Sequence, residues 1–328
     1  MANLTVPRSR RMVVAMKVES TYGTDAFGGS YLAANIVPCF NISPAITLEE
    51  IENLALSGDI GRLPSGIGRE LAGVTFEMFI RGAGAAYSAS VKPEADSALQ
   101  ACGLSSTFSG GVGSEIVTVG PVATPSSYTI YVVQENGSTL KMAGCFGDVD
   151  FTMRAGGIIT ARFSFQGMLL GESDVAFVAG TIAGTPAYPT VKSAAFQIDT
   201  DNYAPRIATI GFRMGNVLQA VPSVNAVGGV AGFFISDRRP LFTIDPEANS
   251  IATHDWFSDH KAGTLMDASF LIGSVQYNKL QFKFNASLAA GLQIVQRSWG
   301  SRDGLTSFPT TLLATISAGQ DDFSLIFS

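Results

Sequence analysis

The stretch AGVTFEMFIR at Ala72–Arg81 alternates apolar and polar residues along its length. In an extended chain, successive side chains point to opposite faces, so such alternation predicts a strand with one packed face. The other face would meet water or a partner. The two sets are Val74, Phe76, Met78 and Ile80 on the apolar face, and Thr75, Glu77 and Arg81 on the polar face.

The same order of elements occurs a second time in the chain. After Ala72–Arg81 come a helix signal at Pro93–Gly103 (PEADSALQACG) and further strands. After RPLFTIDP at Arg239–Pro246 come ATHDWFSDHKAG at Ala252–Gly263 and, again, further strands. Each unit also begins with two strands joined by a long loop. A duplicated β module without visible chemistry indicates assembly rather than catalysis.

A shift in composition at Gly180–Pro189 (GTIAGTPAYP) marks the expected boundary between the two units. We therefore predict a basic N-terminal arm at residues 1–18, a first domain at 19–185 and a second domain at 186–328. The expected fold class is mainly β, with two tandem β-sandwich or barrel domains that each carry a short flanking α-helix. Helices this short and few exclude a fold built from βαβ crossovers.

Local signals place the other elements. Asn136-Gly137 favours a type I′ hairpin between strands at Tyr128–Gln134 and Ser138–Met142. The stretch Leu48–Gly68 is polar and contains glycine, and is expected to be a loop. Further strands are expected at Arg11–Val18, Ile36–Thr47, Cys145–Arg154, Ile158–Met168, Arg206–Leu218, Phe233–Asp245, Leu265–Ile272, Leu280–Ala286 and Leu312–Ser317, and helices at Glu94–Leu104 and Thr253–His260.

Composition narrows the possible functions. Hydrophobic residues make up 46% of the chain and charged residues 15%, against about 25% charged in ordinary domains. A surface this poor in charge favours oligomer interfaces. No stretch approaches the roughly 20 apolar residues of a membrane-spanning helix. The net charge of −6 argues against a general nucleic-acid binder. Three cysteines without metal-like spacing predict free thiols and a reducing compartment.

Charge is unevenly distributed along the chain. Residues 1–18 carry four basic side chains and no acid, whereas residues 19–190 carry sixteen acids and seven bases. A basic arm could therefore dock on the acidic surface of a neighbouring copy. From charge alone, a basic tail without a partner is an equal alternative.

The sequence offers no catalytic constellation. The two histidines, His254 and His260, are six positions apart and do not share a helical face as metal ligands would. The glycine clusters lack the Lys and Ser/Thr of a phosphate-binding loop. Clustered acids at Glu49, Glu50 and Glu52 are typical of a solvated face. We expect no enzyme activity, no metal site and no cofactor.

Four segments, in this order and spacing, resemble the major tail tube proteins of long-tailed bacteriophages: KVESTYGTDA (Lys17–Ala26), LAGVTFEMFIRG (Leu71–Gly82), LQACGL (Leu99–Leu104) and SDRRPLFTID (Ser236–Asp245). The resemblance covers most of the chain, and no single motif carries it. It implies two tandem tail-tube-type domains in a virion protein that polymerises as stacked rings, through which DNA passes without specific binding. The duplication is similar to that of members in which three chains build a pseudo-sixfold ring.

The resemblance also implies partners and surfaces. A tape measure protein and tail terminator and baseplate proteins are the expected partners, with assembly in the host cytoplasm. The loops Glu49–Arg69 and Val221–Gly232 are expected to contact the next ring. Acids expected to face the lumen are Glu70, Glu77, Asp237, Asp245, Glu52 and Asp148. Expected inter-ring contacts are Arg8, Arg10, Arg11, Glu49, Glu50, Asp59, Arg62, Val224 and Val227.

Three alternatives remain at this point. A contractile-tail or type VI tube protein would share the fold but typically has one tube domain per chain. A decoration or minor tail protein would form trimers or spikes. A carbohydrate-binding β-sandwich would display exposed aromatic platforms, for which Trp256 and Trp299 give poor support.

Overall fold

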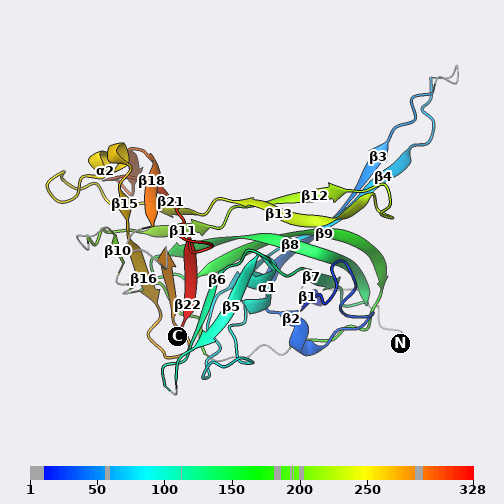
Figure 1. Cartoon of the computed structure of the whole chain (residues 1–328), viewed down its shortest axis with the longest axis horizontal. Coiled ribbons are helices and arrows are strands. Elements are labelled where there is room, and N and C mark those ends of the chain that lie inside the picture. The colour runs from blue at the N-terminus through cyan, green and yellow to red at the C-terminus, as the bar shows by residue number, and fades with distance from the viewer. Residues whose placement is uncertain are drawn as a thin grey trace, which may run out of the picture.

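The structure is a computed structural model that describes residues 11–55, 60–111, 113–180, 186–192, 194, 196–198, 203–284 and 291–328. It is mainly β, with antiparallel sheets and two short α-helices, as the sequence predicts. Its described strands form a 12-stranded main sheet, a 6-stranded second sheet and two separate hairpins. The main sheet curves over the rest of the molecule (Figure 1).

Strand β8 (Ser138–Arg154) is the centre of the main sheet. One edge pairs along its length with β9 (Thr160–Asp174), which is followed by β4 (Gly66–Phe79) and β3 (Phe40–Ile51). The other edge is divided between two strands. Its first half pairs with β7 (Tyr128–Val133), and its last five residues pair with β11 (Thr209–Arg213). The sheet therefore branches at β8.

Each branch continues to an end of the main sheet. After β7 come β1 (Val13–Val18) and β2 (Ile36–Val37). After β11 come β14 (Leu241–Ile244), β21 (Thr310–Ala314), β18 (Leu292–Arg297) and β15 (Leu265–Met266). The main sheet thus combines strands from both predicted units.

The second sheet also combines both units. Its order is β10 (Gln197–Ile198), β16 (Ala268–Ile272), β17 (Leu280–Phe284), β22 (Phe323–Phe327), β6 (Ile116–Pro121) and β5 (Leu104–Ser109). The remaining described elements are α1 (Asp96–Ala101), α2 (Trp256–Ala262), the 3₁₀ turn η2 (Ala33–Asn35) and the small hairpin of β19 (Gly300–Arg302) and β20 (Leu305–Ser307). Neither α-helix in the described part of the chain has the length and apolarity to cross a bilayer.

Aromatic side chains fill the space between the sheets. The ring of Phe212 on β11 lies 6.1 Å from Phe151 of β8 and 4.8 Å from Phe323 of β22, measured between centroids. Phe282 and Phe284 of β17 contact the same ring. Because Phe212 is 1% exposed, it joins the two sheets and residues from both halves of the chain in one core.

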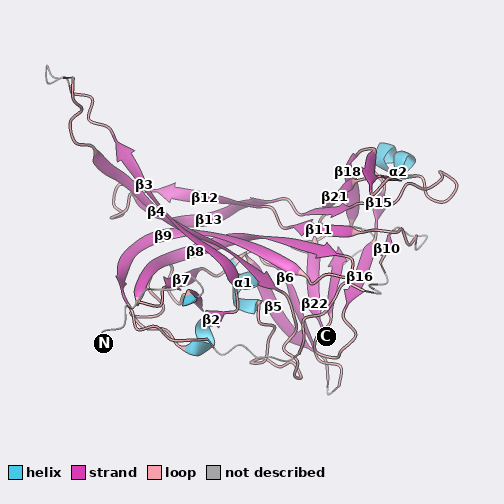
Figure 2. Cartoon of the chain, turned by 180° about the vertical axis from the view of Figure 1, so that it is seen from behind, coloured by secondary structure: helices cyan, strands magenta, loops and turns pink. Residues whose placement is uncertain are grey.

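Two long hairpins leave the main sheet. The outer part of β3 and β4 extends away from the body, as both views show (Figures 1 and 2). The hairpin of β12 (Asn216–Pro222) and β13 (Val230–Arg238) instead lies along β8 and β9, on the side away from α1 (Figure 1). Its Val230 and Phe233 pack against Phe146 of β8, with Leu71 and Met168 beside them. One hairpin is docked and the other projects.

The structure corrects several predicted boundaries. The expected loop Leu48–Gly68 begins and ends in strands, because β3 runs to Ile51 and β4 begins at Gly66. Cross-strand backbone pairs continue outward as far as Ile51 with Gly66, in a segment whose side chains are mostly exposed on both faces. The expected loop Val221–Gly232 likewise begins and ends in β12 and β13.

Three other predicted strands are divided or merged. Arg206–Leu218 is broken into β11 and β12 at Gly215, whose φ of 69° falls in the left-handed region that favours glycine. Conversely, the predicted strands Ser138–Met142 and Cys145–Arg154 are one strand, β8. The hairpin between β7 and β8 and both helices are confirmed, the helices with shorter or shifted bounds. The predicted type I′ turn is wrong, because Gly137 has a positive φ of 92° and Asn136 does not.

The contacts of Phe212 generate a stability prediction. Phe212→Ala removes a buried ring that joins both sheets, and it should lower the free energy of unfolding by about 3–5 kcal/mol. Denaturant unfolding followed by circular dichroism measures this change. Phe257→Ala, at a side chain that is 62% exposed on α2, is the matched control and should change stability by less than about 0.5 kcal/mol. Equal effects of the two substitutions would contradict the central position of Phe212.

Candidate functional site

The face of the main sheet that points away from its core carries a row of alternating charges. Glu77 on β4 stands opposite Arg162 on β9, Arg162 opposite Asp150 on β8, and Asp150 opposite Arg213 on β11. Side chains that stand opposite one another on the same face of a sheet are close enough to interact. The row crosses four strands and passes from the first half of the chain to the second.

The two aspartates of β8, Asp148 and Asp150, both lie close to Arg213. Arg213 Nε is 3.4 Å from Asp150 Oδ1 and 3.7 Å from Asp148 Oδ2. Asp148 Oδ1 also accepts a hydrogen bond of 2.9 Å from the backbone N–H of Asn216. Partial burial raises the pKa of both carboxyls, and the nearby Arg213 lowers it to a smaller extent. These are partly desolvated acids held beside a cation.

The predicted lumen acids therefore lie in different surroundings. Glu77 and Asp148 lie on this exposed face, where Asn41 Nδ2 donates a hydrogen bond of 3.0 Å to Glu77. Asp245 accepts hydrogen bonds from the backbone N–H groups of Ala208 and Thr209, and it pairs with Arg302 at 3.0 Å. Asp245 thus fixes the start of β11.

The remaining predicted acids are on the hairpins. Glu52 pairs with Arg62 at 2.8 Å in the projecting hairpin, Glu70 is half-buried on β4, and Asp237 is exposed on β13. Glu77 and Asp148 thus lie on the same face of the main sheet, whereas Glu52, Glu70 and Asp237 lie elsewhere. The row on that face alternates in sign and is not uniformly acidic.

The projecting hairpin, residues 45–72 of β3, β4 and their connection, combines ion pairs with exposed apolar side chains. Arg69 Nε is 2.6 Å from Glu49 Oε2, and Glu50 lies next to this pair on the exposed strand. The apolar side chains Ile51, Leu54, Ile60 and Ile67 are 58–106% exposed. A hairpin with this much exposed apolar surface has the character of an interaction site.

The other predicted contact residues are at separate places. Val224 and Val227, at the tip of the β12–β13 hairpin, are fully exposed. Arg11 pairs with Glu135, and its guanidinium lies 5.5 Å from the centroid of the Phe177 ring. Arg8, Arg10 and Asp59 lie outside the described residues.

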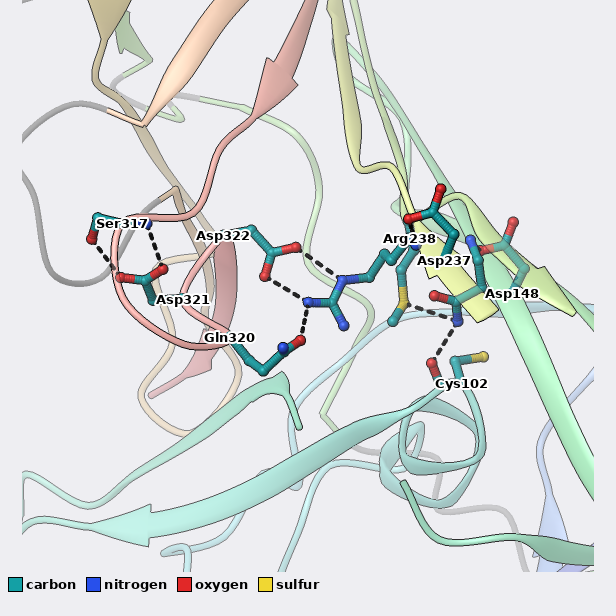
Figure 3. A network of polar contacts seen from close by, with 10 residues as sticks. Cys102, Asp148, Asp237, Arg238, Ser317, Gln320, Asp321 and Asp322 are labelled. Carbon is teal, nitrogen blue, oxygen red and sulfur yellow. Dashed lines mark hydrogen bonds and ion pairs between the residues drawn. The ribbon is translucent and has the colours of Figure 1, made fainter. Parts of the chain in front are cut away.

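A buried ion pair connects the end of β13 to the C-terminal strand. The guanidinium of Arg238 points to Asp322 and Gln320, as Figure 3 shows. It donates to both carboxylate oxygens of Asp322, at 2.9 and 3.0 Å, and to Gln320 Oε1 at 2.7 Å. The side chains of Arg238 and Asp322 are only 13% and 3% exposed. Burial raises the pKa of Asp322, and the charge of Arg238 partly offsets that rise.

The comparison with protein families decides the identity. The profile of the family described as phage tail tube protein matches residues 9–311. The chain belongs to the phage tail tube proteins. No curated protein matches it at a significant level. The resemblance inferred from four short segments is therefore confirmed over nearly the whole chain.

A phage tail tube protein is a structural, non-enzymatic part of the virion tail, and its family implies self-polymerisation. Among the described residues, no three His, Cys, Asp or Glu side chains are grouped as a metal site. His254 is buried and packs between Tyr203 and Trp256, with ring centroids 4.9 and 4.4 Å away. His254 is thus part of a packed aromatic cluster in this tail tube protein.

The sequence did not reveal how the tail tube protein holds its docked hairpin. Tyr22, in the segment KVESTYGTDA, accepts a hydrogen bond from Phe233 N at 2.6 Å and donates one to Phe233 O at 3.0 Å. Nearby Glu19 accepts hydrogen bonds from Ser127, Thr129 and the backbone N–H of Gly144. Glu19 holds the segment Lys17–Ala26 to β8, and Tyr22 holds the β12–β13 hairpin to that segment. Their pairing partners are more than 100 residues away, beyond the range of local patterns.

The position of Asp150 predicts a pH-dependent effect in this tail tube protein. Because its pKa is raised on folding, charging Asp150 costs folding free energy, and that cost is complete above the folded-state pKa. Asp150→Asn should therefore raise the free energy of unfolding at pH 7. The gain should vanish below about pH 3.9, the ordinary pKa of aspartate, because the carboxyl is then neutral in both states.

Urea unfolding of both proteins at a series of pH values measures this difference. Asp174→Asn, at an exposed position at the end of β9, serves as the control. A loss of stability in Asp150→Asn at pH 7 would mean that attraction to the arginines outweighs burial.

The ion pair with Asp322 gives a second prediction. Arg238→Met leaves a buried carboxylate without its cation and should cost about 3–5 kcal/mol of stability at pH 7. The loss should shrink as the pH falls, because protonation of Asp322 removes the buried charge. Thermal or denaturant unfolding measures both effects. Arg213→Met, at a side chain that is 64% exposed, is the matched control and should cost no more than about 1 kcal/mol. A pH-independent loss in Arg238→Met would contradict this account.

Proposed function

We propose that three copies of this tail tube protein form a pseudo-sixfold ring, and that stacked rings form the tube through which phage DNA passes into the host. The observation that carries the proposal is the order of strands along the main sheet. Eight strands lie side by side as two sets of four, first β3-β4-β9-β8 and then β11-β14-β21-β18. Three chains would place six such sets around one lumen.

The two sets repeat one pattern of strand pairing. In the first, β3 pairs with β4, β4 with β9, and β9 with β8. In the second, β11 pairs with β14, β14 with β21, and β21 with β18. In each half, a strand that comes before the set pairs with a strand that follows the helix (β1 with β7, β10 with β16), and the helix, α1 or α2, follows the second strand of the set. This repetition supports two tandem tube modules, with a division near the predicted boundary of 185/186.

The exposed face of the main sheet is the proposed lining of the lumen. Closing a sheet into a barrel leaves no edge strand, and one face of each strand then points inward. On the inward face, Arg162 and Arg213 each stand beside a carboxylate, Glu77 or Asp150. Arginines that are already neutralised by neighbours attract phosphates less, so DNA would slide past them without being held.

The remaining partners follow from the proposed place in the virion. A tape measure protein would occupy the lumen before DNA, and tail terminator and baseplate proteins would bind the two ends of the tube. Assembly would occur in the host cytoplasm. The repetition of strand sets within one chain favours this reading over a contractile-tail or type VI tube protein with one module per chain.

Electron microscopy of the purified protein tests the proposal. Hollow tubes with three chains per ring are expected, counted from class averages of end-on views and from the mass of isolated rings. Rings of six chains would leave the tube assignment standing and overturn the tandem-module ring. A monomer that stays monomeric at high concentration would contradict the tube assignment itself.

A further inference from the structure

The contact between β8 and β11 joins the two strand sets within one chain. The last five residues of β8 pair antiparallel with β11, and Asp150 stands opposite Arg213. The first half of β8 is occupied by β7. This edge of β8 is therefore shared between β7 of its own module and β11, the first strand of the second module.

The second module has a corresponding strand with the same division. β18 corresponds to the last half of β8, because each is the last strand of its set in spatial order. β8 pairs with β9 and contacts α1, and β18 pairs with β21 and contacts α2. Its first two residues pair with β15. In the described chain, Ile294–Arg297 pair with β21 alone. The last four of the six residues of β18 thus have an open edge where β8 has β11.

The first strand of the first module supplies the matching edge. β3 corresponds to β11, since each is the first strand of its set and leads into a long hairpin. Among the described strands, β3 pairs only with β4. Its inner segment is Phe40–Ser43, in which Asn41 and Ser43 are exposed and Phe40 and Ile42 are half-buried. Pro44, which lacks an N–H to donate, follows directly.

We infer that the inner end of β3, up to Ser43, of one copy pairs antiparallel with the end of β18, from Gln296 onward, of the next copy, as β11 pairs with β8 inside the chain. The inference rests on the proposed ring and names the strands that close it. The occupant of each edge is therefore a second copy of this chain. Because the pattern is head-to-tail, each copy offers one edge of each kind and a closed ring leaves none open.

The internal contact also predicts the register. Phe242-Thr243 on β14 corresponds to Phe76-Glu77 on β4 by sequence and by burial of the phenylalanine. In the second set, Thr243 stands opposite Thr311, and Thr311 stands opposite Gln296. In the first set, Glu77 stands opposite Arg162 in the same way, and Arg162 stands opposite Asp150. Gln296 therefore corresponds to Asp150.

The same reasoning places Ser43. Arg213 stands opposite Leu241, one residue before Phe242, and Ser43 stands opposite Thr75, one residue before Phe76. Ser43 therefore corresponds to Arg213. Since Arg213 stands opposite Asp150, Ser43 of one copy should stand opposite Gln296 of the next. Both side chains are exposed in the single chain.

Disulfide trapping tests this register. Opposite residues of an antiparallel pair have Cα atoms about 4.5–5.5 Å apart, within the range that a disulfide spans. Ser43→Cys combined with Gln296→Cys, in a Cys39→Ala background, should give covalent species that end at three chains on non-reducing gels after mild oxidation. Cys102 and Cys145 are buried and should not react. Each single variant alone should give no ladder, and a mixture of the two should give dimers only.

Two control pairs make the outcome decisive. Asp150→Cys with Arg213→Cys, the internal counterpart, should form its disulfide within one chain without assembly. Ser43→Cys with Gln293→Cys is displaced by about 10 Å along β18 and should not cross-link. Tubes that form without a Ser43–Gln296 cross-link, while the internal control cross-links, would overturn the strand assignment and leave the proposed function standing. Absence of rings or tubes from every variant and from the unmodified protein would overturn both.

Discussion

Backbone hydrogen bonding along β8 is the constraint on which the fold depends. β8 has 17 residues, and its two edges satisfy three partner strands. Register shifts between Lys141 and Met142 and between Ala143 and Phe146 lie in the half that pairs with β7, and they increase the bend of β8 before its partner changes to β11. The first half of β8 can therefore close the first module, while its second half begins the sheet that continues into the second.

Elements with a local signal could be predicted from the sequence, and those that depend on distant partners could not. Alternation identified the strand at Ala72–Arg81, and Asn136-Gly137 identified the β7–β8 hairpin. The outer part of β3 and β4 was missed because both faces of a projecting hairpin meet solvent, so no apolar alternation marks it. The branching of β8 was missed because it depends on pairing with β11, which is more than 50 residues away.

The candidate site shows the same division. Glu77 could be placed on the polar face of its strand by period alone, and the structure places it there. Asp245 was predicted in the same way, from its place in a strand. Its contacts with Arg302 and with two backbone N–H groups instead give it a structural role. Sequence reasoning identifies which residue types a strand presents. It does not identify the counter-charge, because ion partners such as Arg238 and Asp322 are 84 residues apart.

The unequal hairpins affect how one ring can sit on another. The β12–β13 hairpin is held to the body by Tyr22, whereas the β3–β4 hairpin projects with its apolar side chains exposed. On a ring of tandem modules, long and docked hairpins would alternate around the rim. A rim with this alternation has half as many equivalent rotational settings as a rim of identical modules. Successive rings would then have a defined angular phase, and a tube would carry the same orientation of its chains from one end to the other.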